Sequence, residues 1–177
     1  MSTEHIDESV DLPEDGQAGG GRLEEEGDVA ADYLEELLDI ADIDGDIDIE
    51  VRSGRTYISV VSEEEDNAAL QALVGPDGEV LEALQELARL SVLTATENRS
   101  RLVLDITGYR AERSAVLRGL AEDAVARARE TAEPVALDPM SAYERKIVHD
   151  AVAELGLVSE SEGEGSGRHV VVMLAES

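Results

Sequence analysis

The sequence contains no cysteine, no tryptophan and no phenylalanine, so four tyrosines are its only large aromatic residues. Without cysteine the chain forms no disulfide and has no thiolate, which fits a reducing compartment. The core must be aliphatic, and surfaces on which bases could stack are scarce. No apolar run approaches the roughly 20 residues that a bilayer-spanning helix needs, and the first residues lack the basic and apolar regions of a secretory signal. We expect a cytoplasmic protein without direct membrane insertion.

Basic residues are also few: 14 Lys and Arg stand against 42 Asp and Glu, a formal net charge of −28. This balance argues against a nucleic-acid partner, because phosphate binding draws its affinity from Lys and Arg that release counterions. The charge is uneven, however. Residues 1–28 hold ten acids and one base, whereas residues 99–129 hold seven arginines and four acids. A local basic region therefore survives inside an acidic protein.

The hydrophobic pattern predicts an α+β fold. Residues 1–28 are acidic and Gly-rich without a period and are expected to form a disordered tail. The next segments predict a helix at residues 29–41 and a hairpin around Ser53-Gly54 with strands at 47–51 and 56–61. Two helices at residues 67–75 and 79–93 and a strand at 101–107 complete this part. A long helix follows at residues 109–130, then a short extended piece at 134–138 and a helix at 140–155. A strand pair comes last, with one strand on each side of a Gly-rich turn at residues 160–165. We expect two modules, at residues 29–108 and 109–177.

Gly75, Pro76, Asp77 and Gly78 connect two of the predicted helices. Glycines let such a loop approach a nucleic-acid backbone, and the following helix N-terminus offers free N–H groups and a positive dipole end. Asp77 would repel phosphate, and Pro76 removes an amide donor. Pro-Asp-Gly is also a common turn composition. The segment therefore predicts either a nucleic-acid contact or an ordinary connection between helices.

Arg145 and His149 stand four residues apart, which places both on one face of the last predicted helix. A guanidinium fork suits phosphate, and an imidazole can donate a hydrogen bond or stack on a base. Lys146 and Arg168 would add phosphate contacts. Since His169 alternates with Arg168 along its strand, only one of the two faces a ligand easily, and we favour Arg168. The alternative is structural: His149 packs against the strand pair, and Arg145 caps the helix or pairs with Glu144 or Asp138.

The block from SAYERKIVHDAVAELG through ESEGEG to Arg168 resembles the Arg-xxx-His domain, a small fold associated with single-stranded nucleic acid. The order α-β-β-α-(Gly-x-x-Gly)-α-β over residues 29–107 resembles the type II KH domain. A KH domain followed directly by an Arg-xxx-His domain resembles the Jag/KhpB family of bacterial RNA-binding proteins, over about residues 29–174. The segments VGPDGEVLEALQELARL and RLVLDITGYRAERSAVLRGLAEDAV add to this resemblance.

The resemblance implies a non-catalytic protein that binds single-stranded RNA through both modules. The expected contacts are Gly75, Pro76, Asp77, Gly78, Arg145, Lys146, His149 and Arg168. It also implies a post-transcriptional regulator linked to cell envelope growth or cell shape, with a second small KH protein and proteins near the membrane insertase as further partners. Four more arginines, Arg99, Arg101, Arg110 and Arg113, are expected at the junction of the modules, where they join the two sites or form a solvated face.

The sequence gives little support to catalysis: no motif of a P-loop, a zinc protease or a nucleophile elbow is present. Three histidines do not make a metal cluster, and the acidic run at residues 39–50 lacks carboxylates at the positions that a calcium loop needs. We expect no cofactor and no metal. The alternative function is an acidic interaction adaptor with reduced RNA affinity, which would bind ribosomal or insertase-associated proteins.

Overall fold

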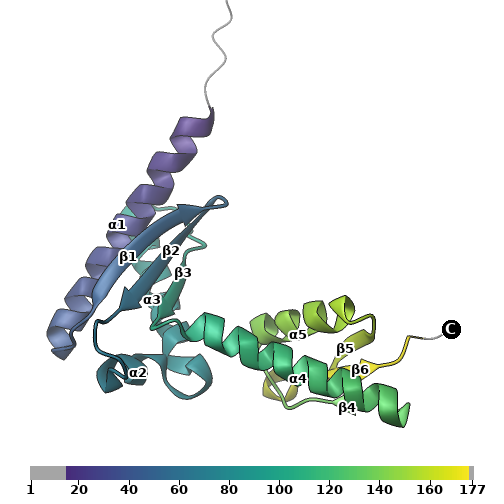
Figure 1. The fold of residues 1–177 in the computed structure, drawn as a ribbon. Coiled ribbons are helices and arrows are strands. Elements are labelled where there is room, and N and C mark those ends of the chain that lie inside the picture. Colours follow the sequence, from purple (N-terminus) through teal and green to yellow (C-terminus); the bar gives the residue numbers. More distant parts are fainter. Residues whose placement is uncertain (1–14, 176–177) are drawn as a thin grey trace, which may run out of the picture. The chain divides into compact units, whose positions relative to one another are not determined.

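A computed structural model describes residues 15–175 and divides the chain after Thr107 into two compact units. The division lies one residue from the boundary predicted between residues 108 and 109. Figure 1 shows a helix-covered sheet in each unit. Across residues 15–175, none of the helices has the length and apolar character to cross a membrane.

The first unit contains one three-stranded sheet and its helices. Its elements are α1 (Asp15–Ala41), β1 (Asp46–Arg52), β2 (Arg55–Val61), α2 (Ala68–Val74), the 3-10 turn η1 (Pro76–Gly78), α3 (Glu79–Thr96) and β3 (Val103–Ile106). The sheet order is β1-β2-β3. β1 and β2 are antiparallel, with Ile49 opposite Ile58, whereas β2 and β3 are parallel, with Ile58 opposite Leu104. A parallel pair needs a long crossover, which α2 and α3 supply.

One face of this sheet is buried under helices α1 and α3. Ile58 and Val60 of β2 are buried and alternate with half-buried residues, as a strand covered on one face requires. The helices contribute buried aliphatic residues to the same core, among them Ala30, Leu34, Leu38, Leu81, Ala88 and Val92. The opposite face carries charged and polar side chains, for example Glu50 opposite Tyr57.

The predicted disordered tail is wrong for residues 15–28, which form the first half of α1; residues 1–14 lie outside the described part. Three contacts hold this half to the rest of the unit. The Thr56 hydroxyl donates to the Leu23 carbonyl oxygen at 2.9 Å, and the Ser100 hydroxyl donates to the Glu26 carboxylate at 2.8 Å. Gly27 is buried so close to β1 that a Cβ there would lie 2.7 Å from the Ile49 side chain. Tertiary contacts therefore order a segment whose composition alone favours disorder.

The second unit contains two helices and a small antiparallel sheet. Its elements are α4 (Tyr109–Thr131), β4 (Val135–Ala136), α5 (Ala142–Glu154), β5 (Val158–Glu162), the 3-10 turn η2 (Gly165–Gly167) and β6 (His169–Met173), in the sheet order β4-β6-β5. The predicted strand pair is confirmed. Its turn is shorter than predicted, because Glu160 to Glu162 belong to β5. The turn begins at Gly163, where a Cβ would lie 2.8 Å from the Gly167 carbonyl oxygen.

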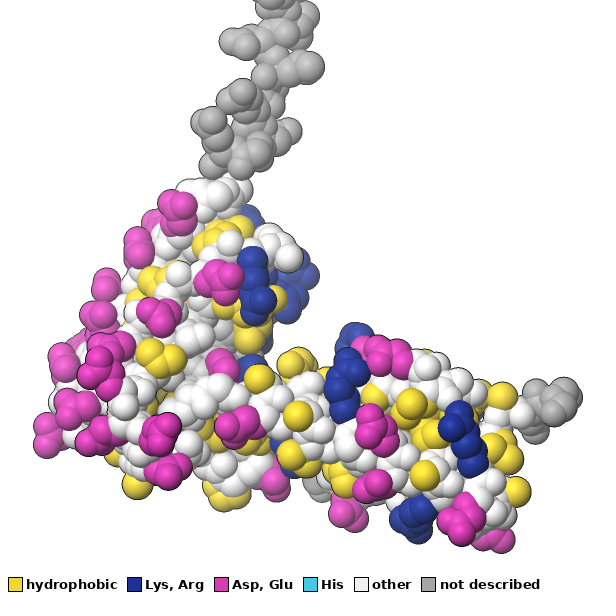
Figure 2. Space-filling model, in the orientation of Figure 1, with side chains coloured by type: hydrophobic (Ala, Val, Ile, Leu, Met, Phe, Trp, Pro, Cys, Tyr) yellow, Lys and Arg dark blue, Asp and Glu magenta, His cyan; other side chains and the backbone are white. Residues whose placement is uncertain are grey.

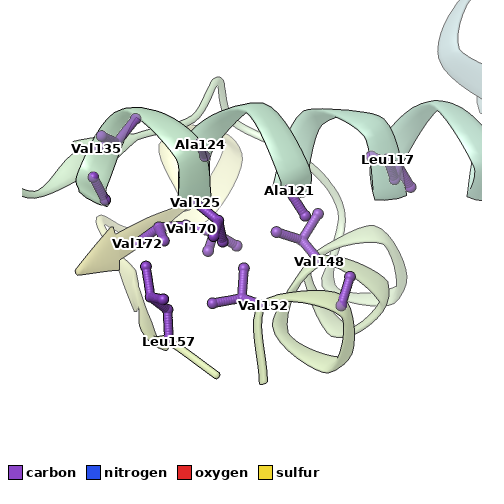
Figure 3. Close-up of a cluster of buried hydrophobic side chains, with 12 residues drawn as sticks. Leu117, Ala121, Ala124, Val125, Val135, Val148, Val152, Leu157, Val170 and Val172 are labelled. Carbon is purple, nitrogen blue, oxygen red and sulfur yellow. The ribbon is translucent and has the colours of Figure 1, made fainter. Parts of the chain in front are cut away.

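The core of the second unit is aliphatic throughout, as the shortage of aromatic residues requires. Figure 3 shows side chains of α4 and α5 that meet those of β6, with Val125 beside Val170 and Val172. Val148 and Val152 enter this core from α5, and both are fully buried. Arg145 and His149 flank this buried face of α5 and are half-buried, so they lie at the edge of the core.

Candidate nucleic-acid interface

The N-terminus of α5 is fixed by a reciprocal cap. The Ser141 hydroxyl accepts a hydrogen bond from the Glu144 amide at 3.2 Å, and the Glu144 carboxylate accepts one from the Ser141 amide at 3.1 Å. The other Glu144 oxygen accepts a 2.7 Å bond from Arg113 Nε of α4. A carboxylate bonded on both oxygens sets where α5 begins and how it lies against α4. The helix that presents Arg145 and His149 therefore has a defined start.

Arg145 is half-buried and bonded to the loop that precedes its own helix. Its Nη1 donates to the Met140 carbonyl oxygen at 2.9 Å, and the Met140 amide donates to the Arg168 carbonyl oxygen at 3.2 Å. The capping or ion-pair partners proposed for Arg145, Glu144 and Asp138, are not the ones used. The remaining guanidinium N–H groups make no bond to any residue in 15–175. One donor thus anchors the side chain and the others stay available.

His149 packs against β5 through both of its ring nitrogens. Nδ1 shares a 2.7 Å hydrogen bond with the Ser159 hydroxyl, and Nε2 shares a 2.8 Å bond with the Ser161 hydroxyl. Burial, and secondarily the nearby Arg145 charge, lowers the pKa of His149 from its ordinary 6.5, while Asp150 acts in the opposite direction. The neutral ring then donates to one serine and accepts from the other. The structural alternative foreseen for His149 is the arrangement found here.

A shallow hollow of about 630 Å³ lies beside this pair of bonds. It is lined by the C-terminal half of α5 and by β5, and its polar groups include His149, Ser159 and Ser161. Asp150 and Glu160 also line it, so the hollow itself is not electropositive. Arg145 is not among its lining residues, and the structure does not bring the arginine and the imidazole together on this hollow.

The two other cations predicted for this site differ in their surroundings. Lys146 forms an exposed pair with Asp150 at 2.8 Å, which is a weak interaction that salt screens. Arg168 is exposed, and its side chain makes no hydrogen bond or ion pair within residues 15–175. His169 is half-buried and its Nδ1 donates to the Gly167 carbonyl oxygen at 3.0 Å. Of this neighbouring pair, Arg168 is the one that presents a free cation.

The Gly75–Gly78 loop is a tight turn whose glycines are both required. Gly75 has φ 72°, and a Cβ there would clash with the Val80 side chain. Gly78 is buried with φ 77° and is the N-cap of α3 without any side-chain hydrogen bond to the helix. Asp77 is exposed and itself has φ 53°. The start of α3 therefore has no side-chain cap, although the Gly78 and Glu79 amides donate to the Gly75 and Pro76 carbonyl oxygens, and it carries the negative charges of Asp77 and Glu79.

The four additional arginines form two groups. All four were predicted at the junction of the modules. Arg99 and Arg101 line a small hollow of the first unit with Arg22 and Arg55. In the second unit, Arg110 lies 5.6 Å from the centre of the Tyr143 ring and Arg113 pairs with Glu144. Sequence reasoning missed Arg22 and Arg55, because no periodic signal links residues so far apart in the chain.

Within residues 15–175 no group of three His, Asp or Glu side chains could hold a metal ion.

The sequence matches the family model of the R-3-H domain, which is named for its Arg-xxx-His spacing, over residues 115–174.

Several curated proteins are similar to most of this chain. RNA-binding protein KhpB of Clostridium symbiosum is 32% identical over 148 residues, which are 83% of this chain and 65% of the relative. RNA-binding protein KhpB of Lactiplantibacillus plantarum is 32% identical over 144 residues, or 81% of this chain and 43% of the relative. The Bacillus subtilis protein of the same name is 32% identical over 103 residues, or 56% and 50%. The chain thus spans between 43% and 65% of the length of these relatives.

Proposed function

We propose that this protein, which belongs to the Jag/KhpB family, binds single-stranded RNA through both of its units and without catalysis. The relatives carry RNA binding in their names, and the R-3-H match lies inside the second unit. The first unit supports a type II KH assignment by its order of elements, α-β-β-α-α-β, with a Gly-x-x-Gly turn between α2 and α3. Helix α1 would extend that domain to residue 15, well before residue 29.

The observation that carries this proposal is the state of Arg145. A guanidinium that is anchored by one N–H and has its other donors unbonded loses little conformational freedom when it binds a phosphate. Arg168 is adjacent through the backbone, since Met140 bonds to the side chain of Arg145 and to the main chain of Arg168. We assign phosphate binding to these two arginines, with Lys146 as an exposed electrostatic addition.

His149 has a different role in this proposal from the direct contact that its spacing suggests. Both ring nitrogens are already bonded, so the imidazole holds the hydroxyls of Ser159 and Ser161 in place at the hollow. Serine hydroxyls can donate to a ribose or a base as well as accept. We infer that His149 positions hydroxyls for a sugar or a base while the arginines bind phosphate.

The first unit would add a second, weaker contact at the Gly75–Gly78 loop. The positive dipole end at the start of α3 favours phosphate, whereas the charges of Asp77 and Glu79 oppose it. Two weak sites on one chain raise the effective concentration of the second binding event, so avidity does not require strong individual contacts. By family resemblance the role would be post-transcriptional regulation linked to cell envelope growth or cell shape, with a second small KH protein as partner.

The test is fluorescence anisotropy of a labelled single-stranded RNA at low salt, with Arg145→Ala, Arg145→Lys and Arg127→Ala as variants. Arg127 is an exposed α4 arginine whose side chain makes no hydrogen bond or ion pair within residues 15–175, and its loss changes the net charge equally. We expect Arg145→Ala to weaken binding about 5-fold at about 0.1 M salt, the value of one phosphate contact to a single strand. Arg145→Lys should recover part of the loss, and Arg127→Ala should bind as the wild type does.

The alternative function, an acidic interaction adaptor, predicts a basic protein as the binding partner in place of RNA. Acidic side chains on the open face of the first sheet, such as Asp48 and Glu50, favour a basic protein partner. If wild-type protein fails to bind single-stranded RNA at any salt concentration and instead binds a basic ribosomal protein, the RNA proposal is wrong. An equal loss of RNA affinity in the Arg145→Ala and Arg127→Ala variants would instead rule out the phosphate site assigned to Arg145 and leave only general electrostatic attraction.

A further inference from the structure

The arginines of the first unit are gathered at one end. Residues 1–107 contain six arginines and no lysine. One arginine lies in the N-terminal half of α1, two flank the β1–β2 turn and two lie in the loop between α3 and β3, namely Arg22, Arg52, Arg55, Arg99 and Arg101. Figure 2 shows Lys and Arg side chains near the β1–β2 turn, while Asp and Glu are spread along α1 and at its far end. Charge is therefore segregated along this unit.

Four of these arginines surround one small polar hollow. Arg22, Arg55, Arg99 and Arg101 line a space of about 50 Å³, together with Glu26 and Thr56. A water molecule occupies about 30 Å³ of liquid, so the space accepts one or two water-sized groups. The terminal oxygens of a single phosphate group have that size.

The hollow has a buried anchor and free cations. Glu26 is only 3% exposed; one of its oxygens accepts from the Ser100 hydroxyl and the other lies 3.7 Å from Arg22 Nε. Against this one carboxylate stand four guanidinium groups. The side chains of Arg55, Arg99 and Arg101 make no hydrogen bond or ion pair to any residue in 15–175. Three unpaired arginines side by side, in a chain with three times as many acids as bases, leave a positive charge that an anion would neutralise.

We propose that this arginine hollow is a phosphate-binding site that holds the backbone of the RNA strand, an inference that rests on the proposed function. Guanidinium groups bind phosphate through paired N–H donors, which suits arginine better than lysine. The hollow is distinct from the Gly75–Gly78 loop. That loop precedes α3 and Arg99 follows it, and a helix of 18 residues spans about 27 Å. An RNA strand that runs along α3 would contact both sites.

The test compares two charge-matched double variants, Arg99→Gln with Arg101→Gln and Arg118→Gln with Arg127→Gln. The control pair lies on exposed positions of α4, and its one described ion pair, from Arg118 to Glu154, is at the surface. Binding of labelled single-stranded RNA is measured by anisotropy across a salt series. We expect the Arg99/Arg101 variant to lose about 5-fold in affinity per lost contact at about 0.1 M salt, and its salt slope to fall by about 0.7 per contact. The control should keep the wild-type slope.

If the Arg99/Arg101 variant binds RNA with the affinity and slope of the control, the inference is overturned and the proposed function stands. If neither the variants nor the wild-type protein binds RNA, the proposed function is overturned. Titration with inorganic pyrophosphate then tests whether the hollow binds phosphate. Pyrophosphate should shift the side-chain Nε–H NMR signals of Arg99 and Arg101 in the wild-type protein, and it should leave that of Arg127 unchanged. Absence of that shift would overturn the phosphate site itself.

Discussion

The Ser100 hydroxyl donates a 2.8 Å hydrogen bond to the Glu26 carboxylate across 74 residues of sequence, in the interior of the first unit. The same hydroxyl oxygen accepts a 3.1 Å bond from the Leu102 amide. Glu26 and Ser100 are both buried, so neither partner can turn to water if the other is removed. This pair joins α1 to the loop before β3, and its Glu26 also lines the arginine hollow.

Replacement of Ser100 by alanine should therefore destabilise the first unit. The change leaves the Glu26 carboxylate and the Leu102 amide without this partner, which costs about 1–3 kcal/mol for a buried group. Urea unfolding followed by circular dichroism measures the change. Ser166→Ala, an exposed serine in the η2 turn, is the control and should leave the unfolding midpoint unchanged. A Ser100→Ala midpoint equal to that of the control would show that this bond contributes nothing.

The lowered pKa of His149 predicts a loss of stability in mild acid. Because burial and Arg145 disfavour the imidazolium, the folded pKa lies below the unfolded value of 6.5, and protons bind more readily to the unfolded chain. The stabilising contribution is present above about pH 6.5 and is lost as the pH falls through the folded pKa. Urea unfolding of the second unit, followed by the Val170 methyl NMR signals, should show this loss as the pH falls below about 6.5.

The control for that titration is His149→Gln, which removes the titrating group. Its acid-induced loss of stability should be smaller than that of the wild type over the same range, because the many carboxylates of the chain act equally in both proteins. Identical pH profiles for the two proteins would contradict the assignment of the loss to His149.

Alanine substitutions at two glycines should change the free energy of unfolding in opposite directions. Gly75→Ala places a Cβ against Val80 at φ 72°, so we expect a destabilisation above about 1 kcal/mol. Gly119 lies inside α4, where a Cβ meets nothing within 4 Å, so Gly119→Ala should stabilise by about 0.5–1 kcal/mol. Thermal unfolding of both variants checks the pair. Destabilisation by Gly119→Ala would mean that α4 tolerates side chains less well than its exposure indicates.

Removal of the charge at Asp77 should strengthen RNA binding. Two like charges about 7 Å apart in water repel by about 0.6 kcal/mol, so Asp77→Asn should bind about 3-fold more tightly at low salt. Asparagine tolerates the positive φ of this position. Asp66→Asn is matched in chemistry, exposure and positive φ, and it should change nothing. If both variants gain affinity equally, the effect reports net charge and not the loop.

The elements with strong local patterns were predictable from the sequence. The β-forming residues at 56–61 and the apolar run in His169–Met173 predict strands, and both are present. The first half of α1 was not predictable, because Gly19, Gly20 and Gly21 and the surrounding acids have low helix propensity and no apolar period. Its partners, Thr56 and Ser100, lie far along the chain, and tertiary contacts outweigh local preference there.

The candidate site was predictable in part. A four-residue spacing places Arg145 and His149 on one face of α5, but it does not say which neighbours occupy their donors. Ser159 and Ser161 share one face of β5 by strand periodicity, and this pattern is the signal from which a bridge to His149 could have been inferred. The arginine hollow has no such signal, since its four arginines come from three separate segments.

The bond from Glu26 to Ser100 also sets an order of events during synthesis. Helix α1 leaves the ribosome before the strands of its own unit, and its buried face has no partner until β2 and then β3 follow. Long-range pairings of this kind slow folding, because the chain between the partners must close into a loop first. We therefore expect the nascent N-terminal segment to stay protease-sensitive until residue 106 has emerged from the exit tunnel, and then to become protected together with the completed sheet.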